Sequence, residues 1–156
     1  MEKAFLQSIS DYQKIIYKIC RIYRDRREDQ EDLFQEIVFQ LWKSYPSFKS
    51  ESKISSWIYR VALNTAMAVY RKASPPIDYV GEFPESIHPY NDSREPIAEE
   101  QLYWVLRHLN DPEKALVSLY LEDFSYQEIA EITGISESNV GVRLNRIKNK
   151  LKEIIK

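Results

Sequence analysis

The distribution of prolines limits the folding of this chain more than any other feature of its sequence. Five of the seven prolines lie between residues 74 and 96, together with one glycine. Proline lacks a backbone donor and blocks helix interiors, so this segment cannot sustain a helix and is expected to be extended or disordered. Only three glycines occur among 156 residues, which leaves little room for hairpins or phosphate-cradling loops. The chain is therefore expected to form one helical part on each side of the segment.

Apolar residues recur at helical spacing on both sides of the proline segment, and no stretch alternates as a strand would. The predicted helices cover residues 4–23, 29–44, 54–72, 97–109, 112–122, 126–133 and 137–155. Asp111 and Pro112 are expected to supply a cap and a first-turn proline. The predicted fold class is all-α, with two small helical domains at residues 1–74 and 98–156, joined by a flexible acidic linker at 75–97.

Charge follows the same division of the chain. Residues 1–74 carry a surplus of +4, residues 75–100 a balance of −6, and residues 101–156 cancel. Cys20 is the only cysteine, which excludes an internal disulfide and a cysteine-based zinc site, and it is expected to be a small core residue. No apolar run reaches the roughly twenty residues that cross a bilayer, and no signal-peptide pattern is present. We expect a cytoplasmic protein without membrane insertion.

Residues 124–151 contain the start and stop signals of two short helices. Ser125 and Glu128 have the spacing of a capping box, and Gly134 can adopt the left-handed conformation that ends the first helix. Ser136 can cap the second helix. Two caps around a tight turn are typical of a helix-turn-helix, in which the second helix enters the DNA major groove.

The second of these helices has an apolar stripe and a polar face. Val140, Leu144, Ile147 and Leu151 recur at steps of three and four residues and predict the buried side. The opposite face can meet phosphates and base edges; its candidate DNA-binding residues are Ser138, Asn139, Val142, Arg143, Arg146 and Lys150. A solvated basic helix would show the same amphipathicity. The two caps and the turn glycine favour DNA recognition.

Taken together, these motifs resemble the extracytoplasmic-function sigma factors, the smallest promoter-recognition subunits of bacterial RNA polymerase. The stretch 29–42, DQEDLFQEIVFQLW, is similar to the region-two helix that docks on the polymerase clamp. Residues 48–72, which include WIYRVALN at 57–64, resemble the part that opens and reads the −10 element. Residues 106–151 resemble region four, which reads the −35 element. The resemblance covers nearly the whole chain and implies promoter DNA and core polymerase as partners.

The helix predicted at 29–44 has a polar arc opposite its core face. Phe39 lies in the middle of this arc, where it is either an ordinary exposed apolar residue or an anchor for a partner. With the resemblance, the candidate polymerase-binding residues are Asp32, Gln35, Glu36 and Phe39.

The helix predicted at 54–72 carries a second stripe of aromatic, amide and guanidinium groups beside its core face. Such groups suit a single strand, because cations follow phosphates while π-faces and amides hold unstacked bases. Trp57 could equally be a core residue. The resemblance adds Phe48, the first residue of the loop 48–53, which resembles the family's base-capture loop. The candidate −10 residues are Phe48, Trp57, Arg60, Asn64 and Arg71.

The sequence departs from the family in two places. Asn139-Val-Gly-Val-Arg143 stands where the recognition helix often has Thr-Val-Lys-Ser-Arg, so Gly141 removes a cation and costs about 1 kcal/mol of helix stability. With this change, the resemblance does not indicate which −35 sequence the helix reads. The missing cation could also weaken the binding of the helix to DNA phosphates. Leu109-Asn-Asp-Pro112 replaces a more usual Leu-Pro, without an evident functional consequence.

Two other functions compete with this interpretation. A conventional helix-turn-helix regulator explains residues 98–156 but not the stripe at 57–71. An enzyme acting on nucleic acid would need convergent site geometry, whereas His88, His108 and the acids near Asp29 form no such pattern. We therefore expect no catalysis, no metal and no cofactor. The resemblance also allows for a membrane-anchored anti-sigma factor as a partner.

Overall fold

The computed structural model describes residues 2–48, 53–71 and 97–155. Within these ranges the chain is helical, with short turns and no strand. The α-helices are α1 (Glu2–Tyr23), α2 (Arg27–Ser44), α3 (Ile54–Arg71), α4 (Ile97–Leu106), α5 (Asp111–Leu121), α6 (Tyr126–Thr133) and α7 (Glu137–Ile155), and a 3-10 turn, η1 (Tyr45–Ser47), follows α2. The all-α prediction is confirmed.

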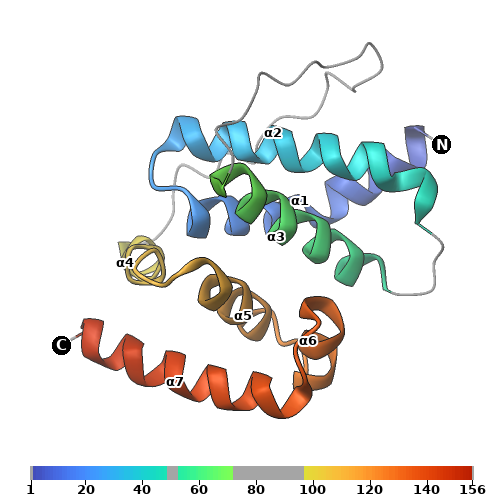
Figure 1. Ribbon diagram of the computed structural model, residues 1–156. Coiled ribbons are helices and arrows are strands. Elements are labelled where there is room, and N and C mark those ends of the chain that lie inside the picture. Colours follow the sequence, from blue (N-terminus) through green and yellow to red (C-terminus); the bar gives the residue numbers. More distant parts are fainter. Residues whose placement is uncertain (1, 49–52, 72–96, 156) are drawn as a thin grey trace.

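Helices α1, α2 and α3 pack against one another as the first domain (Figure 1). Each contributes one apolar face, and residues such as Ile16, Phe34 and Ile58 are completely buried. Cys20 is a buried free thiol in this core, as predicted. Burial raises the pKa of its thiol well above the usual value. The second part of the chain packs α5, α6 and α7 together, with α4 against the end of α7.

The helix starts follow local capping chemistry, with one correction to the sequence analysis. The cap of α5 is Asn110, whereas Asp111 was expected. The Asn110 side chain accepts the Glu113 amide at 3.0 Å, and the Glu113 carboxylate accepts the Asn110 amide at 2.9 Å. Asp111 and Pro112 then occupy the first two helical positions. The extra asparagine in Leu109-Asn-Asp-Pro therefore completes a capping box.

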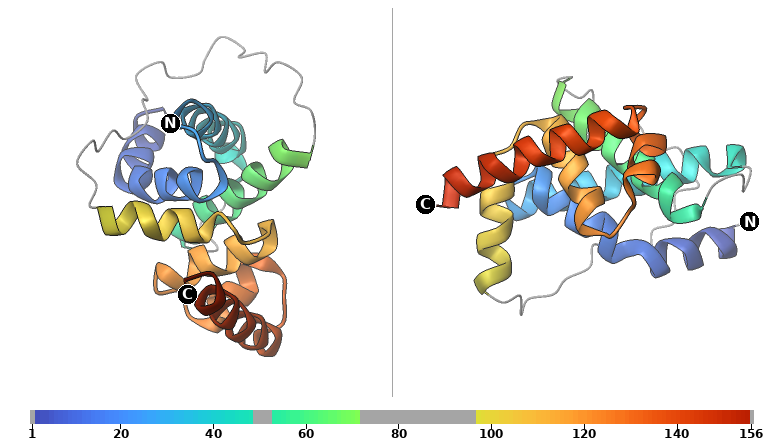
Figure 2. Two further views of the ribbon diagram at one scale, coloured as in Figure 1. Left: turned by 90° about the vertical axis from the view of Figure 1, so that its left-hand side faces the viewer. Right: turned by 90° about the horizontal axis from the view of Figure 1, so that it is seen from below.

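The two domains are in direct contact, which the sequence analysis did not predict. Figures 1 and 2 show α4 and α5 lying against the α1–α3 bundle, with α7 on the far side of the second domain. Helix α3 contacts both α5 and α6, and α1 contacts both α4 and α5. The linker predicted at 75–97 lies outside the described residues, apart from the start of α4. None of the helices in the described ranges combines the length and apolarity needed to cross a membrane.

We predict that Asn110→Ala lowers the free energy of unfolding by about 1 kcal/mol, because it removes the oxygen that accepts the Glu113 amide. Urea denaturation followed by circular dichroism would measure the change. Asn145→Ala, at an exposed position inside α7, is the matched control and should have little effect. Equal losses for both variants would contradict a capping role for Asn110.

Candidate nucleic-acid interface

Helices α6 and α7 form the predicted helix-turn-helix. The Ser125 hydroxyl accepts the Glu128 amide at 3.1 Å, and the Glu128 carboxylate accepts the Ser125 amide at 3.0 Å. This bond from the Ser125 amide, followed by one from Lys53, lowers the pKa of the Glu128 carboxyl. Gly134 ends α6 with a φ of 80°, and the Ser136 hydroxyl accepts the Asn139 amide at 3.3 Å. The capping box, the left-handed glycine and the second cap are all confirmed.

Helix α7 presents its two faces as the sequence predicted. Val140, Leu144 and Ile147 are buried against α5 and α6, and Leu151 is half-buried. The candidate −35 residues are all exposed; they are Ser138, Asn139, Val142, Arg143, Arg146 and Lys150. Val142 is a large apolar side chain with 49% of its surface exposed. The exposed face of α7 is therefore polar apart from Val142, and it is accessible for binding in a DNA groove.

The cations of α7 differ in their surroundings. Lys150 forms an ion pair of 2.9 Å with Glu113 of α5, and Lys148 lies 4.6 Å from the ring centroid of Tyr120. Burial alone would raise the pKa of Glu113, but bonds from Lys150 and the Asn110 amide outweigh it and lower that pKa. Arg143 and Arg146 make no ion pair with another described residue. The guanidinium groups are therefore the cations best placed to bind phosphates or bases.

Gly141 lies beneath the ring of Tyr126, the first residue of α6. A methyl group added at Gly141 would sit 3.4 Å from Cε2 of that ring. Tyr126 is itself exposed, so its ring can shift slightly to accept the methyl group. The glycine is thus not required by close backbone packing at this position.

We predict that Gly141→Ala raises the free energy of unfolding by up to about 1 kcal/mol, because alanine has the higher helix propensity. Gly134→Ala is the contrasting variant and should destabilise the protein, since alanine disfavours a φ of 80°. Chemical denaturation of both variants would measure the two changes. Destabilisation by Gly141→Ala would show that the space above this position is tighter than the structure indicates.

Helix α3 presents the predicted single-strand stripe only in part. Arg60, Asn64 and Ala68 are exposed on one side of the helix. Trp57 is half-buried, with its ring 4.8 Å from Phe48 and 6.0 Å from Tyr45 between centroids. Trp57 packs on the core beside Phe48, which agrees with the core role that the sequence left open. Residues 49–52 of the expected base-capture loop and the side chain of Arg71 lie outside the described residues.

Helix α2 carries the candidate polymerase-binding residues. Asp32 and Gln35 are exposed and Phe39 is half-buried. Glu36 was expected on the open polar arc, but it is only 8% exposed and accepts a 3.0 Å hydrogen bond from Gln40. A helical wheel could not reveal the burial of Glu36, because this burial depends on tertiary packing.

Sequence reasoning missed the contacts that join α3 to the helix-turn-helix. Arg60 donates a 3.0 Å hydrogen bond to the Glu131 carbonyl oxygen near the end of α6, and Lys53 pairs with Glu128 at 3.2 Å. A cavity of about 130 Å³ lies between the domains. It is lined by Arg60, Leu63, Asn64, Met67, Pro112, Ala115, Leu116, Ile132, Thr133 and Ile135. Nothing in the periodicity of α3 distinguishes a surface that binds DNA from one that binds another domain.

Two family models match this chain, one to each domain. Sigma-70 region 2 matches residues 9–75, and sigma-70 region 4 matches residues 99–151. The chain is 34% identical to RNA polymerase sigma factor SigZ of Bacillus subtilis, over 80% of this chain and 72% of that protein. It is 28% identical to the ECF RNA polymerase sigma-E factor of Haemophilus influenzae, over 99% of this chain and 90% of that protein.

Two solved structures share the fold. The sigma factor RpoE of Bartonella quintana, in complex with the anti-sigma factor NepR, aligns with a TM-score of 0.75 at 22% identity, covering 98% of this chain and 97% of that one. CnrH, in complex with the cytosolic domain of CnrY, aligns with a TM-score of 0.70 at 18% identity, covering 99% and 89%.

The helix-turn-helix with its exposed basic face and the preceding three-helix bundle define a promoter-recognition subunit of the sigma-70 type. The chain belongs to the sigma-70 family, in its extracytoplasmic-function group. It is a sigma factor that directs RNA polymerase to promoters. A conventional helix-turn-helix regulator is not favoured, because such a protein does not explain the region 2 match over residues 9–75.

Proposed function

We propose that α7 reads the −35 element in duplex DNA and that α3 holds the unpaired strand of the −10 element. The observation that carries this proposal is the exposure of Arg143 and Arg146 on one face of a capped recognition helix. Guanidinium groups can bond bidentately to guanine or bind phosphates, and exposed Ser138 and Asn139 add hydrogen-bonding groups at the start of the helix. Lys150 is the weaker candidate in this set, because Glu113 already neutralises it.

The same proposal assigns the first domain, residues 1–74, to strand opening. Asn64 can donate to and accept from the edge of an extruded base, while Arg60 binds phosphate. Phe48 and Trp57 form an adjacent aromatic pair on which a base could stack. The melted state is favoured because only unpaired DNA can make these contacts, so binding energy shifts the equilibrium toward the open strand. No covalent chemistry is assigned to the chain.

The remaining assignments concern partners and compartment. Asp32, Gln35 and Phe39 on α2 form a mixed polar and apolar surface that suits a protein partner, and we assign it to core polymerase. Glu36 would join that surface only after becoming exposed.

Since the polymerase and the promoter are cytoplasmic in bacteria, the chain would act there. The two solved structures with this fold are bound to partners, one named as an anti-sigma factor, which supports a similar regulator here. The linker, residues 75–97, would join the domains across the promoter.

We predict that the two DNA-binding helices can be separated by mutation. Arg143→Ala should weaken holoenzyme binding to duplex −35 DNA by about tenfold and reduce the salt dependence by about one phosphate contact. Asn64→Ala should leave duplex binding unchanged and reduce open-complex formation on a promoter. Fluorescence anisotropy and potassium permanganate footprinting would measure these effects, on promoters first mapped by sequencing RNA starts made by the holoenzyme.

Matched controls for these variants are Arg26→Ala and Gln7→Ala, which change an exposed guanidinium and an exposed amide in the first domain. Neither control should alter either measurement. If Arg143→Ala left the affinity for duplex DNA unchanged, α7 would not be the recognition helix. If Asn64→Ala formed open complexes normally, the assignment of α3 to the −10 strand would be wrong.

A separate prediction concerns polymerase binding. Phe39→Ala should change the free energy of unfolding by no more than about 1 kcal/mol, because the side chain is only half-buried. The same variant should weaken binding to core polymerase. Val142→Ala removes a similarly accessible apolar side chain from α7 and serves as the control. Binding would be measured by titration of labelled protein with purified core polymerase. Equal affinity of the Phe39→Ala variant and the original protein would remove α2 from the interface.

A further inference from the structure

Val142 is the one large apolar side chain on the outward face of α7, within the part of the chain that the structure describes. It is 49% exposed. An α-helix turns by about 100° per residue, so Val142 points about 170° away from the mean direction of the buried stripe. That stripe consists of Val140, Leu144, Ile147 and Leu151. Val142 therefore lies at the centre of the face that is farthest from the core of the protein.

The neighbours of Val142 on this face are polar and exposed. Ser138 precedes it by one turn and Arg146 follows it by one turn, each about 40° to one side. Asn139 and Arg143 lie on one flank. A single exposed apolar residue needs no explanation on an ordinary surface. Val142 differs because it stands in the middle of hydrogen-bonding groups, on the face that the proposed function places in a DNA groove.

The amino-terminal half of this face is built from short side chains. Val142 extends only one carbon beyond Cβ, so it can touch a base only where the helix backbone comes close to the floor of the groove. Ser138 and Asn139 are also short, and Gly141 has no side chain. The Tyr126 ring packs over Gly141, 3.4 Å from where a methyl group would stand, which is about 100° round the helix from Val142. The outward direction is thus left free for close approach to DNA.

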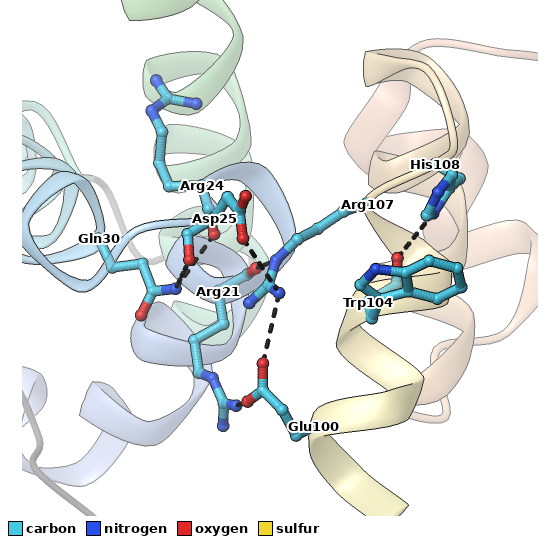
Figure 3. Close-up of polar contacts among 8 residues, drawn as sticks. All are labelled: Arg21, Arg24, Asp25, Gln30, Glu100, Trp104, Arg107 and His108. Carbon is cyan, nitrogen blue, oxygen red and sulfur yellow. Dashed lines mark hydrogen bonds and ion pairs between the residues drawn. The ribbon is translucent and has the colours of Figure 1, made fainter.

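The exposed arginines of α7 differ from arginines that hold the fold together. Where α1 meets α4, Arg107 donates a 2.8 Å hydrogen bond from Nε to the Arg21 carbonyl oxygen, and its Nη1 lies 3.4 Å from Glu100 (Figure 3). Arg143 and Arg146 make no ion pair with another described residue and can therefore bind phosphates. Phosphate contacts position a helix on the duplex, whereas sequence is read by side chains that face base edges.

We propose that Val142 contacts the C5-methyl group of a thymine in the −35 element and so selects thymine at one position. The inference rests on the function proposed above for α7. The thymine methyl is the only alkyl group that a natural base pair presents in the major groove, and apolar side chains recognise it by direct contact. 5-Methylcytosine carries the same group at the same place, so the chemistry read is that of a pyrimidine methyl group.

The pair of changes at positions 141 and 142 makes this preference particular to the chain. The family often has Lys-Ser here, where this sequence has Gly141 and Val142. A hydroxyl group at position 142 would seek a hydrogen-bonding partner, whereas the two valine methyl groups gain by leaving water. Burying about one methyl group corresponds to roughly fourfold in affinity.

The test removes methyl groups from both partners. Val142→Ser removes the two valine methyls, and replacing thymine by uracil removes only the C5-methyl of the base. Ile155→Ser is the control, because it removes an exposed apolar side chain from the end of α7, about 20 Å away. Holoenzymes would be titrated with −35 duplexes that stop short of the −10 element, mapped from RNA starts, with uracil at each thymine in turn. Circular dichroism would verify that the variants retain their helices.

In the original holoenzyme, uracil at one of these thymines should weaken binding roughly fourfold, and Ile155→Ser should behave in the same way. In Val142→Ser the same replacement should change the affinity by no more than about 1.5-fold, as expected for two groups that act through mutual contact. With cytosine at the sensitive position, 5-methylation should raise the affinity, again only where Val142 is present. The salt dependence of binding should be the same in Val142→Ser and the original protein, because no phosphate contact is lost.

Three results would overturn the inference. Equal losses from uracil in Val142→Ser and the original protein would mean that another residue reads the methyl group. A −35 element without a sensitive thymine, in which Arg143→Ala still weakens binding, would refute the contact of Val142 and leave α7 as the recognition helix. A response confined to 5-methylcytosine would refute thymine as the source of the methyl group. If neither uracil nor Arg143→Ala changed the affinity, the function proposed for α7 would itself be wrong.

Discussion

The packing of α3 between two sets of helices holds the described structure together. Ile58, Ala62 and Ala66 are fully buried. One turn of helix also directs Tyr59 and Arg60 toward Phe124 and Glu131 of the second domain. A helix has only about 3.6 residues per turn, so a surface that serves a core and an adjoining domain leaves little room for a third partner. In the proposed function, the DNA strand and the second domain would therefore use the same side of α3.

In the proposed function, α7 and α3 need different chemistry because they would bind different forms of DNA. Helix α7 offers charged and amide groups on a rigid, capped helix, which suits the fixed pattern of donors and acceptors in a major groove. Helix α3 offers the amide of Asn64 and, about two turns earlier, the ring of Trp57 packed on Phe48, and such groups suit bases released from the stack. A protein that binds both forms at once makes strand separation part of its binding equilibrium.

Local signals in the sequence predicted the helices well, whereas the contacts between distant segments escaped prediction. The spans of α6 and α7 agree with the expected ranges, because Ser125, Gly134 and Ser136 determine the helix ends within a few residues. The cap of α5 was placed one residue late, since Asn110 and Asp111 are both good caps and only the geometry distinguishes them. The burial of Glu36 and the bond from Arg60 to Glu131 depend on tertiary packing. A helical wheel treats every polar position as open to solvent.

The ion pair between Lys150 and Glu113 has a consequence for how far along α7 bases can be read. At about 1.5 Å per residue, the 19 residues of α7 extend for about 28 Å, close to the 34 Å repeat of B-form DNA. A straight rod of that length cannot follow a groove that curves around the duplex axis. If α7 reads DNA as proposed, only its amino-terminal turns, up to about Arg146, would approach base edges. In the proposed function, the carboxy-terminal turns, which pair with α5 through Lys150 and Glu113, would instead help to set the tilt of the helix on the DNA.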